Sequence, residues 1–153
     1  MYEHIKFKNA INMRKANYDK FPSTKLTGML VQGWDSIISM LKKKMDARKV
    51  LAVDLYTGVY EEEVLDAFSK EFSGRVMNVR DLMKPEKEIQ TLTERFMTED
   101  VLFGYVTNLK LEDYLDADKV AAARKQISEA KETIVIIGTG AAVVAPQDAM
   151  GVY

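Results

Sequence analysis

Hydrophobic residues form an alternating series of strand-like and helix-like segments along the main body of the chain, which begins at about residue 34. Two runs, residues 49–58 (KVLAVDLYTG) and 133–140 (TIVIIGTG), are almost wholly apolar, and each ends in a glycine turn. Short apolar runs of this kind are typical of strands that are covered on both faces of a sheet. A third strand is expected at residues 75–79 (RVMNV).

The segments between these strands have the spacing of amphipathic helices. Residues 34–45 and 59–72 each place apolar side chains on one helical face, and Gly74 is expected to end the second helix. A longer helix is expected to run to about residue 131, with Asp116 or Asp118 as its cap. Its small residues Ala121, Ala122 and Ala123 would let it lie close to the sheet.

The middle of the chain is less clearly patterned. Pro85 suits the first position of a helix, and Ile89, Leu92 and Phe96 then form its expected buried stripe. Residues 101–106 (VLFGYV) fit either a strand or a buried turn, and residues 111–115 fit a short helix. The whole alternation predicts an α/β fold in which right-handed helical crossovers join parallel strands, with helices on both faces of the sheet.

The amino-acid composition argues against several classes of function. The 153 residues are 47% hydrophobic and 29% charged, which indicates an ordinary globular domain. A net charge of -1 argues against partners such as nucleic acid or a membrane surface, and the sequence contains no membrane-spanning run and no secretory signal pattern. Cysteine is absent, so disulfides, thiolate metal ligands and cysteine nucleophiles are excluded. We expect a cytoplasmic protein.

The only histidine and the basic N-terminal segment offer little chemistry. A zinc site or a Ser-His-Asp mechanism would depend on His4, which lies close to the N-terminus, so no metal site is expected in this chain. Residues 1–25 carry four more positive than negative charges. We expect residues 1–15 to form a loosely held basic arm and residues 16–153 to form the α/β domain.

The glycine turn after the first strand is a poor phosphate site. A Walker-type loop needs a lysine and a hydroxyl side chain after its glycines, and residues 54–60 (DLYTGVY) contain no lysine and a single glycine. Three glutamates, Glu61, Glu62 and Glu63, open the next helix, where they stabilise its positive end and repel a polyphosphate. Asp54 is the best-placed carboxylate, either for a ligand or for neighbouring backbone amides.

The glycine turn after residues 133–137 is better suited to an anion. Gly138, Thr139 and Gly140 begin a dinucleotide-binding fingerprint that fails at its third glycine, where the chain has Val143. The backbone amides from Thr139 to Ala142 have no adjacent acidic residue in the sequence. The candidate ligand-binding residues are therefore Asp54, Gly138, Thr139, Gly140 and Ala141, and the alternative is a purely structural turn. No catalytic residue is expected.

Seven stretches carry a family resemblance. They are NYDKFPSTK (17–25), QGWDSI (32–37), KVLAVDLYTGVYEEEVL (49–65), RDLMKPEKEI (80–89), RFMTEDVLFGYVTNL (95–109), AARKQI (122–127) and IVIIGTGAAVVAPQDA (134–149). Together they resemble the N-terminal region of a bacterial class I mannose-6-phosphate isomerase. This subgroup, common in Bacteroides-like bacteria, carries an extra α/β domain ahead of its cupin domain.

The resemblance implies an accessory or regulatory role in carbohydrate metabolism. The family interconverts mannose 6-phosphate and fructose 6-phosphate at a zinc ion in the cupin, whose ligands match no position in this chain. The N-terminal domain itself resembles P-loop nucleoside and uridine kinases, with residues 49–65 where their phosphate loop would be. The lysine of that loop is missing, so the resemblance implies a degenerate kinase-like domain. Such sheets have about five strands, and the expected sheet is incomplete unless residues 152–153 begin another.

Two other function classes stay open. The chain could be a free-standing module that binds a sugar phosphate, a nucleotide or another small anion, or a structural domain without a small ligand. Its expected partners are a cupin domain or a second copy of itself. The sequence does not tell whether the 153 residues are a whole protein or a fragment.

Overall fold

The computed structural model describes residues 18–25, 27–45, 47–100 and 102–153. Within that part of the chain, every helix and strand lies in one compact unit, Val31–Tyr153. The described residues before this unit, 18–25 and 27–30, contain neither helix nor strand. The expected basic arm, residues 1–15, lies outside the described residues.

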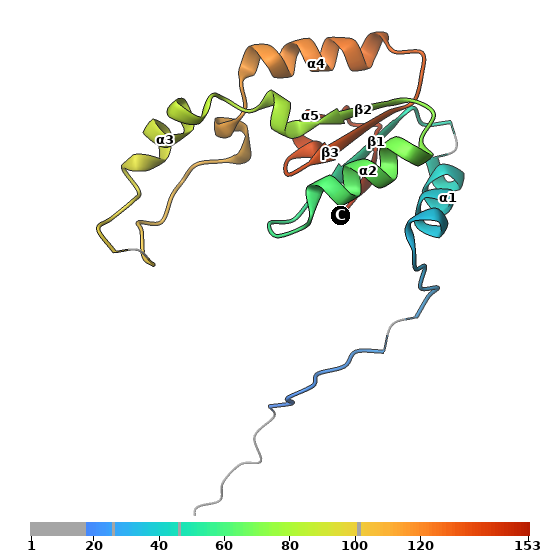
Figure 1. Ribbon diagram of the computed structural model, residues 1–153, viewed down its shortest axis with the longest axis horizontal. Helices are drawn as coiled ribbons and strands as arrows, with labels where there is room; N and C mark the ends of the chain where they lie inside the picture. Colours follow the sequence, from blue (N-terminus) through green and yellow to red (C-terminus); the bar gives the residue numbers. More distant parts are fainter. Residues whose placement is uncertain (1–17, 26, 46, 101) are drawn as a thin grey trace, which may run out of the picture. The chain divides into compact units, whose positions relative to one another are not determined.

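The unit is built on one parallel sheet (Figure 1). Its strands are β1 (Val50–Asp54), β2 (Arg75–Asn78), β3 (Ile134–Gly138) and β4 (Met150–Val152), in the order β2-β3-β1-β4. All three strand pairs are parallel. The α/β prediction is therefore confirmed, and β4 adds a strand to the three that the pattern predicted.

One face of the sheet is covered by α1 (Trp34–Met45) and α2 (Glu61–Glu71). Phe68 on α2 is at the centre of this layer, stacked on Phe72 at a centroid distance of 5.5 Å and edge-on to Trp34 at 6.4 Å. The strands contribute alternate residues to this face, which are Leu51, Val53, Val135 and Ile137. The aromatic cluster thus packs both helices against the central strands.

The opposite face is covered by α4 (Ala117–Glu129), the short α5 (Ala141–Val144) and the 3-10 turn η1 (Val79–Leu82). Asp116 caps α4 as expected, since its carboxylate accepts hydrogen bonds from the backbone of Asp118 and Lys119. Of the three expected sheet-facing alanines only Ala123 is buried, because the other two lie on the solvent side of the helix.

Helix α3 (Glu86–Glu94) and the described residues after it, 95–100 and 102–106, project away from the sheet (Figure 1). The expected buried stripe on α3 is wrong, because no residue of that helix is buried and Phe96 beyond it is only half-buried. Residues 102–106 form neither a strand nor a buried turn, since all of them are exposed. The chain returns to the sheet through the 3-10 turn η2 (Leu111–Tyr114), where a short helix was expected.

Gly74 does not end α2 as expected. The cap is Phe72 in an extended conformation, two residues earlier, and its N–H donates to the Phe68 carbonyl. Gly74 is instead required by close approach, because a Cβ there would collide with the carbonyl oxygen of Thr133. The glycine lets the start of β2 lie against the residue that precedes β3.

Candidate functional site

The candidate site is the junction between the carboxyl ends of β1 and β3. These strands are neighbours, and Asp54 at the end of β1 is in register with Gly138 at the end of β3. After β1 the chain crosses to α2 on one face, and after β3 it crosses to α5 on the other. In open α/β sheets, this divergence of two adjacent strands is where ligands bind.

In this protein the junction is closed by its own hydrogen bonds. The two carboxylate oxygens of Asp54 accept from the backbone N–H groups of Gly140 (2.9 Å) and Ala142 (3.0 Å). The Thr139 hydroxyl donates to the Leu55 carbonyl at 2.9 Å, and the Leu55 N–H donates to the Gly138 carbonyl at 3.3 Å. Four bonds therefore join the two loops across the crevice.

All five predicted site residues lie at this junction, and all except Ala141 take part in its four hydrogen bonds. Two of the four backbone amides that were candidates for a bound anion, those of Gly140 and Ala142, donate to a carboxylate of the same chain. A charged acceptor with two oxygens satisfies two N–H groups about as a phosphate would, so Asp54 takes the position of an anion. The sequence left two roles open for Asp54, a ligand contact or a bond to neighbouring amides. In the structure its carboxylate accepts hydrogen bonds from neighbouring backbone amides.

The geometry of the second turn depends on two glycines. Gly138 has φ 134° and Gly140 has φ 88°, both in the region that side chains with a Cβ rarely adopt. A Cβ on Gly138 would also lie 2.9 Å from the Cβ of Val79 in η1. The glycines therefore set the tight turn that brings the amides of α5 to Asp54.

A cavity of about 320 Å³ lies beside this junction and is lined by Gly138, Thr139 and Gly140 on one side. An ion pair borders it, between Nη2 of Arg80 and Oε2 of Glu61 at 2.9 Å. The Arg80 side chain is 67% exposed, whereas that of Glu61 is 20% exposed and its Oε1 atom is buried without a hydrogen-bond partner among the described residues. At this cavity a cation lies beside a hollow at the carboxyl edge of the sheet.

Sequence reasoning missed Arg80 and gave Glu61 only a helix-stabilising role. The two residues are far apart in the chain, on η1 and at the start of α2, and neither belongs to a recognisable motif. Only the crossover from β1 to β2 brings them together. Their pairing offsets part of the negative charge that the three glutamates place at this edge.

Two further properties bear on chemistry. Within the described ranges, His, Asp and Glu side chains form no group of three or more that is placed to hold a metal ion. In the same part of the chain, no helix has the length and the apolar character that a membrane crossing requires.

Comparison with known proteins gives a family. Residues 33–153, about four-fifths of the chain, match the profile of a family described as Domain of unknown function (DUF8485). The chain belongs to this family. The matched region coincides with the helices and strands of the compact unit. No curated protein and no solved structure matches the chain significantly.

Proposed function

We propose that this chain is a cytoplasmic, non-catalytic accessory domain of a mannose-6-phosphate isomerase, as its sequence resemblance suggests. The observation that carries the proposal is the Asp54 carboxylate bonded to the amides of Gly140 and Ala142. A kinase-like sheet that acted on nucleotides would keep those amides free for phosphate. An accessory domain has no such need and gains stability from filling the crevice.

The charges around the junction support the same proposal. Glu61, Glu62 and Glu63 occupy the first turn of α2, where a phosphate-binding helix would offer free N–H groups and a positive end. Phosphoryl transfer also needs cations at the transferring group, and the loop after β1 has no lysine. In this proposal, the zinc ion and the proton transfer of isomerisation belong to a catalytic cupin partner.

Calorimetry and a coupled assay test the proposal. The full chain is titrated with ATP and magnesium, with mannose 6-phosphate and with fructose 6-phosphate, and is assayed for formation of fructose 6-phosphate. We expect no turnover and no affinity for ATP in the micromolar range. Addition of the chain to a bacterial cupin mannose-6-phosphate isomerase is expected to produce a stoichiometric complex and a change in kcat/KM. Turnover by the chain alone, or indifference of the cupin enzyme, contradicts the proposal.

A second candidate is a module that binds a sugar phosphate in the cavity beside Arg80. Its volume of about 320 Å³ lies at the lower end of the range for small-molecule sites, about 300–1,000 Å³. Arg80 could pair with a phosphate in exchange for Glu61. A ligand present at a hundred times its Kd stabilises a protein by about 2.7 kcal/mol, so a saturable thermal shift in the native chain that is lost in Arg80→Ala would favour this candidate.

A further inference from the structure

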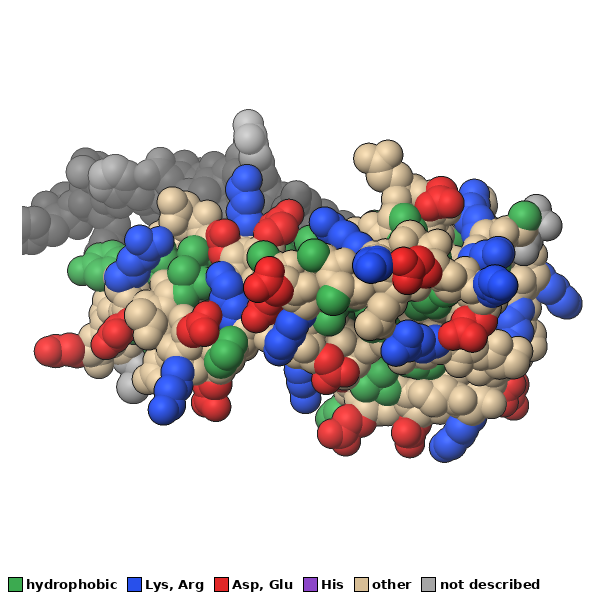
Figure 2. All heavy atoms as spheres, turned by 90° about the horizontal axis from the view of Figure 1, so that it is seen from above, with side chains coloured by type: hydrophobic (Ala, Val, Ile, Leu, Met, Phe, Trp, Pro, Cys, Tyr) green, Lys and Arg blue, Asp and Glu red, His purple; other side chains and the backbone are tan. Residues whose placement is uncertain are grey.

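The described residues between 86 and 106, which are 86–100 and 102–106 and form α3 and the loop after it, are called the projection here. Large apolar side chains lie on its surface, including Leu102 at 81% and Val106 at 98% exposure, with Met97, Phe103 and Tyr105 also exposed. In Figure 2, hydrophobic side chains are interspersed with charged ones over this face of the molecule, including the end that bears the projection. Soluble monomers rarely expose so many large apolar residues in one short segment, so this surface is suited to contact with another protein.

The projection is held in shape by its own hydrogen bonds. The Asp100 carboxylate accepts from the N–H groups of Leu102 (2.8 Å) and Phe103 (3.1 Å), and the Tyr105 N–H donates to the Phe96 carbonyl at 2.8 Å. Gly104 permits this fold, because a Cβ there would lie 2.6 Å from the Phe96 carbonyl oxygen. The apolar side chains are therefore presented outward by a defined turn.

The charge of the projection is negative. Five carboxylates and two cations lie in residues 86–106, which gives a net charge of -3, and all seven side chains are exposed. The acidic residues are Glu86, Glu88, Glu94, Glu99 and Asp100, and the basic ones are Lys87 and Arg95. A surface that complements the projection must therefore combine apolar area with positive charge.

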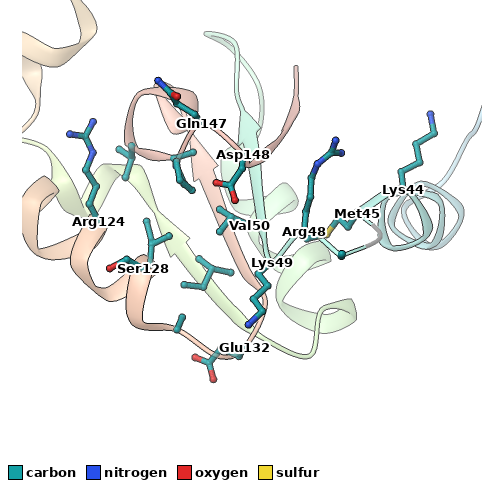
Figure 3. Close-up of a pocket in the computed structure, with 17 residues that line it drawn as sticks. Lys44, Met45, Arg48, Lys49, Val50, Arg124, Ser128, Glu132, Gln147 and Asp148 are labelled. Carbon is teal, nitrogen blue, oxygen red and sulfur yellow. The ribbon is translucent and has the colours of Figure 1, made fainter.

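Such a surface exists at the other edge of the sheet. A cavity of about 1120 Å³ opens between the end of α1, the end of α4 and the segment before β4 (Figure 3). Arg124 and Ser128 of α4 lie on one side of it, and Met45 and Lys44 of α1 on the opposite side. Its size exceeds the range of about 300–1,000 Å³ that is typical of small-molecule sites, so it suits a polypeptide segment.

The lining of this cavity combines apolar and charged residues. The apolar lining residues that are exposed or half-buried are Ala47, Val50, Ala130, Ala145 and Pro146. The charged lining residues are four cations, Lys44, Arg48, Lys49 and Arg124, and two carboxylates, Glu132 and Asp148. None of these six forms an ion pair with another described residue. The net charge of +2 is opposite to that of the projection.

We propose that the projection of one copy of this chain docks in the large cavity of a second copy. The cavity is lined by residues that precede β1 and β3, at the amino edge of the sheet, whereas the projection leaves the sheet after β2, at the carboxyl edge. The two surfaces therefore face away from each other in one copy and meet only between copies. A contact of two different surfaces is heterologous and produces a ring or an open chain of subunits.

Sedimentation velocity on three variants tests the contact. L102S/V106S removes apolar side chains from the projection, R48E/K49E reverses charge at the cavity rim, and K43E/K70E makes the same charge change on exposed positions elsewhere. From about 1 to 200 μM, the native chain and K43E/K70E are expected to exceed the monomer mass of 17.4 kDa. The projection and cavity variants are expected to associate roughly tenfold or more weakly. Unchanged thermal melts control for folding.

Mixing the two defective variants gives the decisive result. Each keeps one intact surface, so a mixture is expected to form a 1:1 dimer and nothing larger, whereas each variant alone stays monomeric. Added salt is expected to weaken this dimer because opposite charges meet in it. A native chain that is monomeric over the whole range, or a mixture that stays monomeric, overturns the proposal. Persistent dimers of the cavity variant alone would mean that projections pair with each other, which also overturns it.

Discussion

Replacement of Asp54 by alanine is expected to destabilise the protein markedly. The change deletes both acceptors at the junction, so the N–H groups of Gly140 and Ala142 lose their partners. A hydrogen bond to a charged group contributes about 1.5–3 kcal/mol, and the bond to Gly140 is partly buried while that to Ala142 is exposed. Because water can replace the exposed partner, we expect a loss of about 2–3 kcal/mol in the free energy of unfolding.

Urea denaturation followed by circular dichroism measures this loss. With an m-value of about 2 kcal/mol/M, the midpoint is expected to fall by roughly 1 M. Asp54→Asn keeps one acceptor oxygen but turns an amide donor toward an N–H group, so it is expected to recover at most half of the loss. Asp66→Ala is the matched control, since the Asp66 carboxylate makes only an exposed ion pair with Lys70 at 3.9 Å. Its expected cost is below about 1 kcal/mol.

Hydrogen exchange localises the effect. In Asp54→Ala the amides of Gly140 and Ala142 are expected to exchange faster than in the native chain, while the amides of β1 and β3 keep most of their protection. If the midpoint of Asp54→Ala moved by less than roughly 0.2 M, or no more than that of Asp66→Ala, the carboxylate would not hold the junction and the reasoning would fail.

Four other substitutions test the fold. Gly138→Ala is expected to cost about 2–3 kcal/mol, since it adds a collision with Val79 to an unfavourable φ. Gly58→Ala, whose φ is 96° but whose Cβ would meet open space, is expected to cost only about 1 kcal/mol; equal losses in urea melts would refute the role of Val79. Phe68→Ala is expected to cost about 3–5 kcal/mol, because the ring is 2% exposed at the centre of the α1–α2 layer. Asp116→Ala removes the cap of α4 and is expected to lower the free energy of unfolding by about 1 kcal/mol in the same urea melts. An unchanged midpoint would mean that the cap does not stabilise the helix.

Most elements of the fold could be predicted because their signals are local. The apolar runs at β1 and β3, the facing residues of α1 and α2 and the cap at Asp116 each depend on residues close together in the sequence. Strand β4 was one exception, because only three residues form it and one of them is a glycine. So short a run shows little periodicity, and it forms a strand because it pairs with β1.

The site could be predicted only in part. Asp54 and the Gly138 turn were found because both follow apolar strands, and carboxyl ends of parallel strands share an edge. That Asp54 accepts from Gly140 and Ala142, 86 and 88 residues away, depends on the register of β1 against β3. The ion pair of Arg80 with Glu61 is likewise a product of chain crossing, and no spacing in the sequence indicates it.

By itself, the sequence determined the main helices and three of the strands, that the strands are parallel, and that Asp54 and the glycine turns lie at one edge of the sheet. Tertiary structure decided what each amphipathic surface contacts. Ile89, Leu92 and Phe96 have the periodicity of a buried stripe, yet all three are only half-buried, because they pack against neither of the two cores that cover the sheet. Periodicity records the side of a helix that favours burial, but burial also requires a second surface, and only the path of the whole chain determines whether one is present.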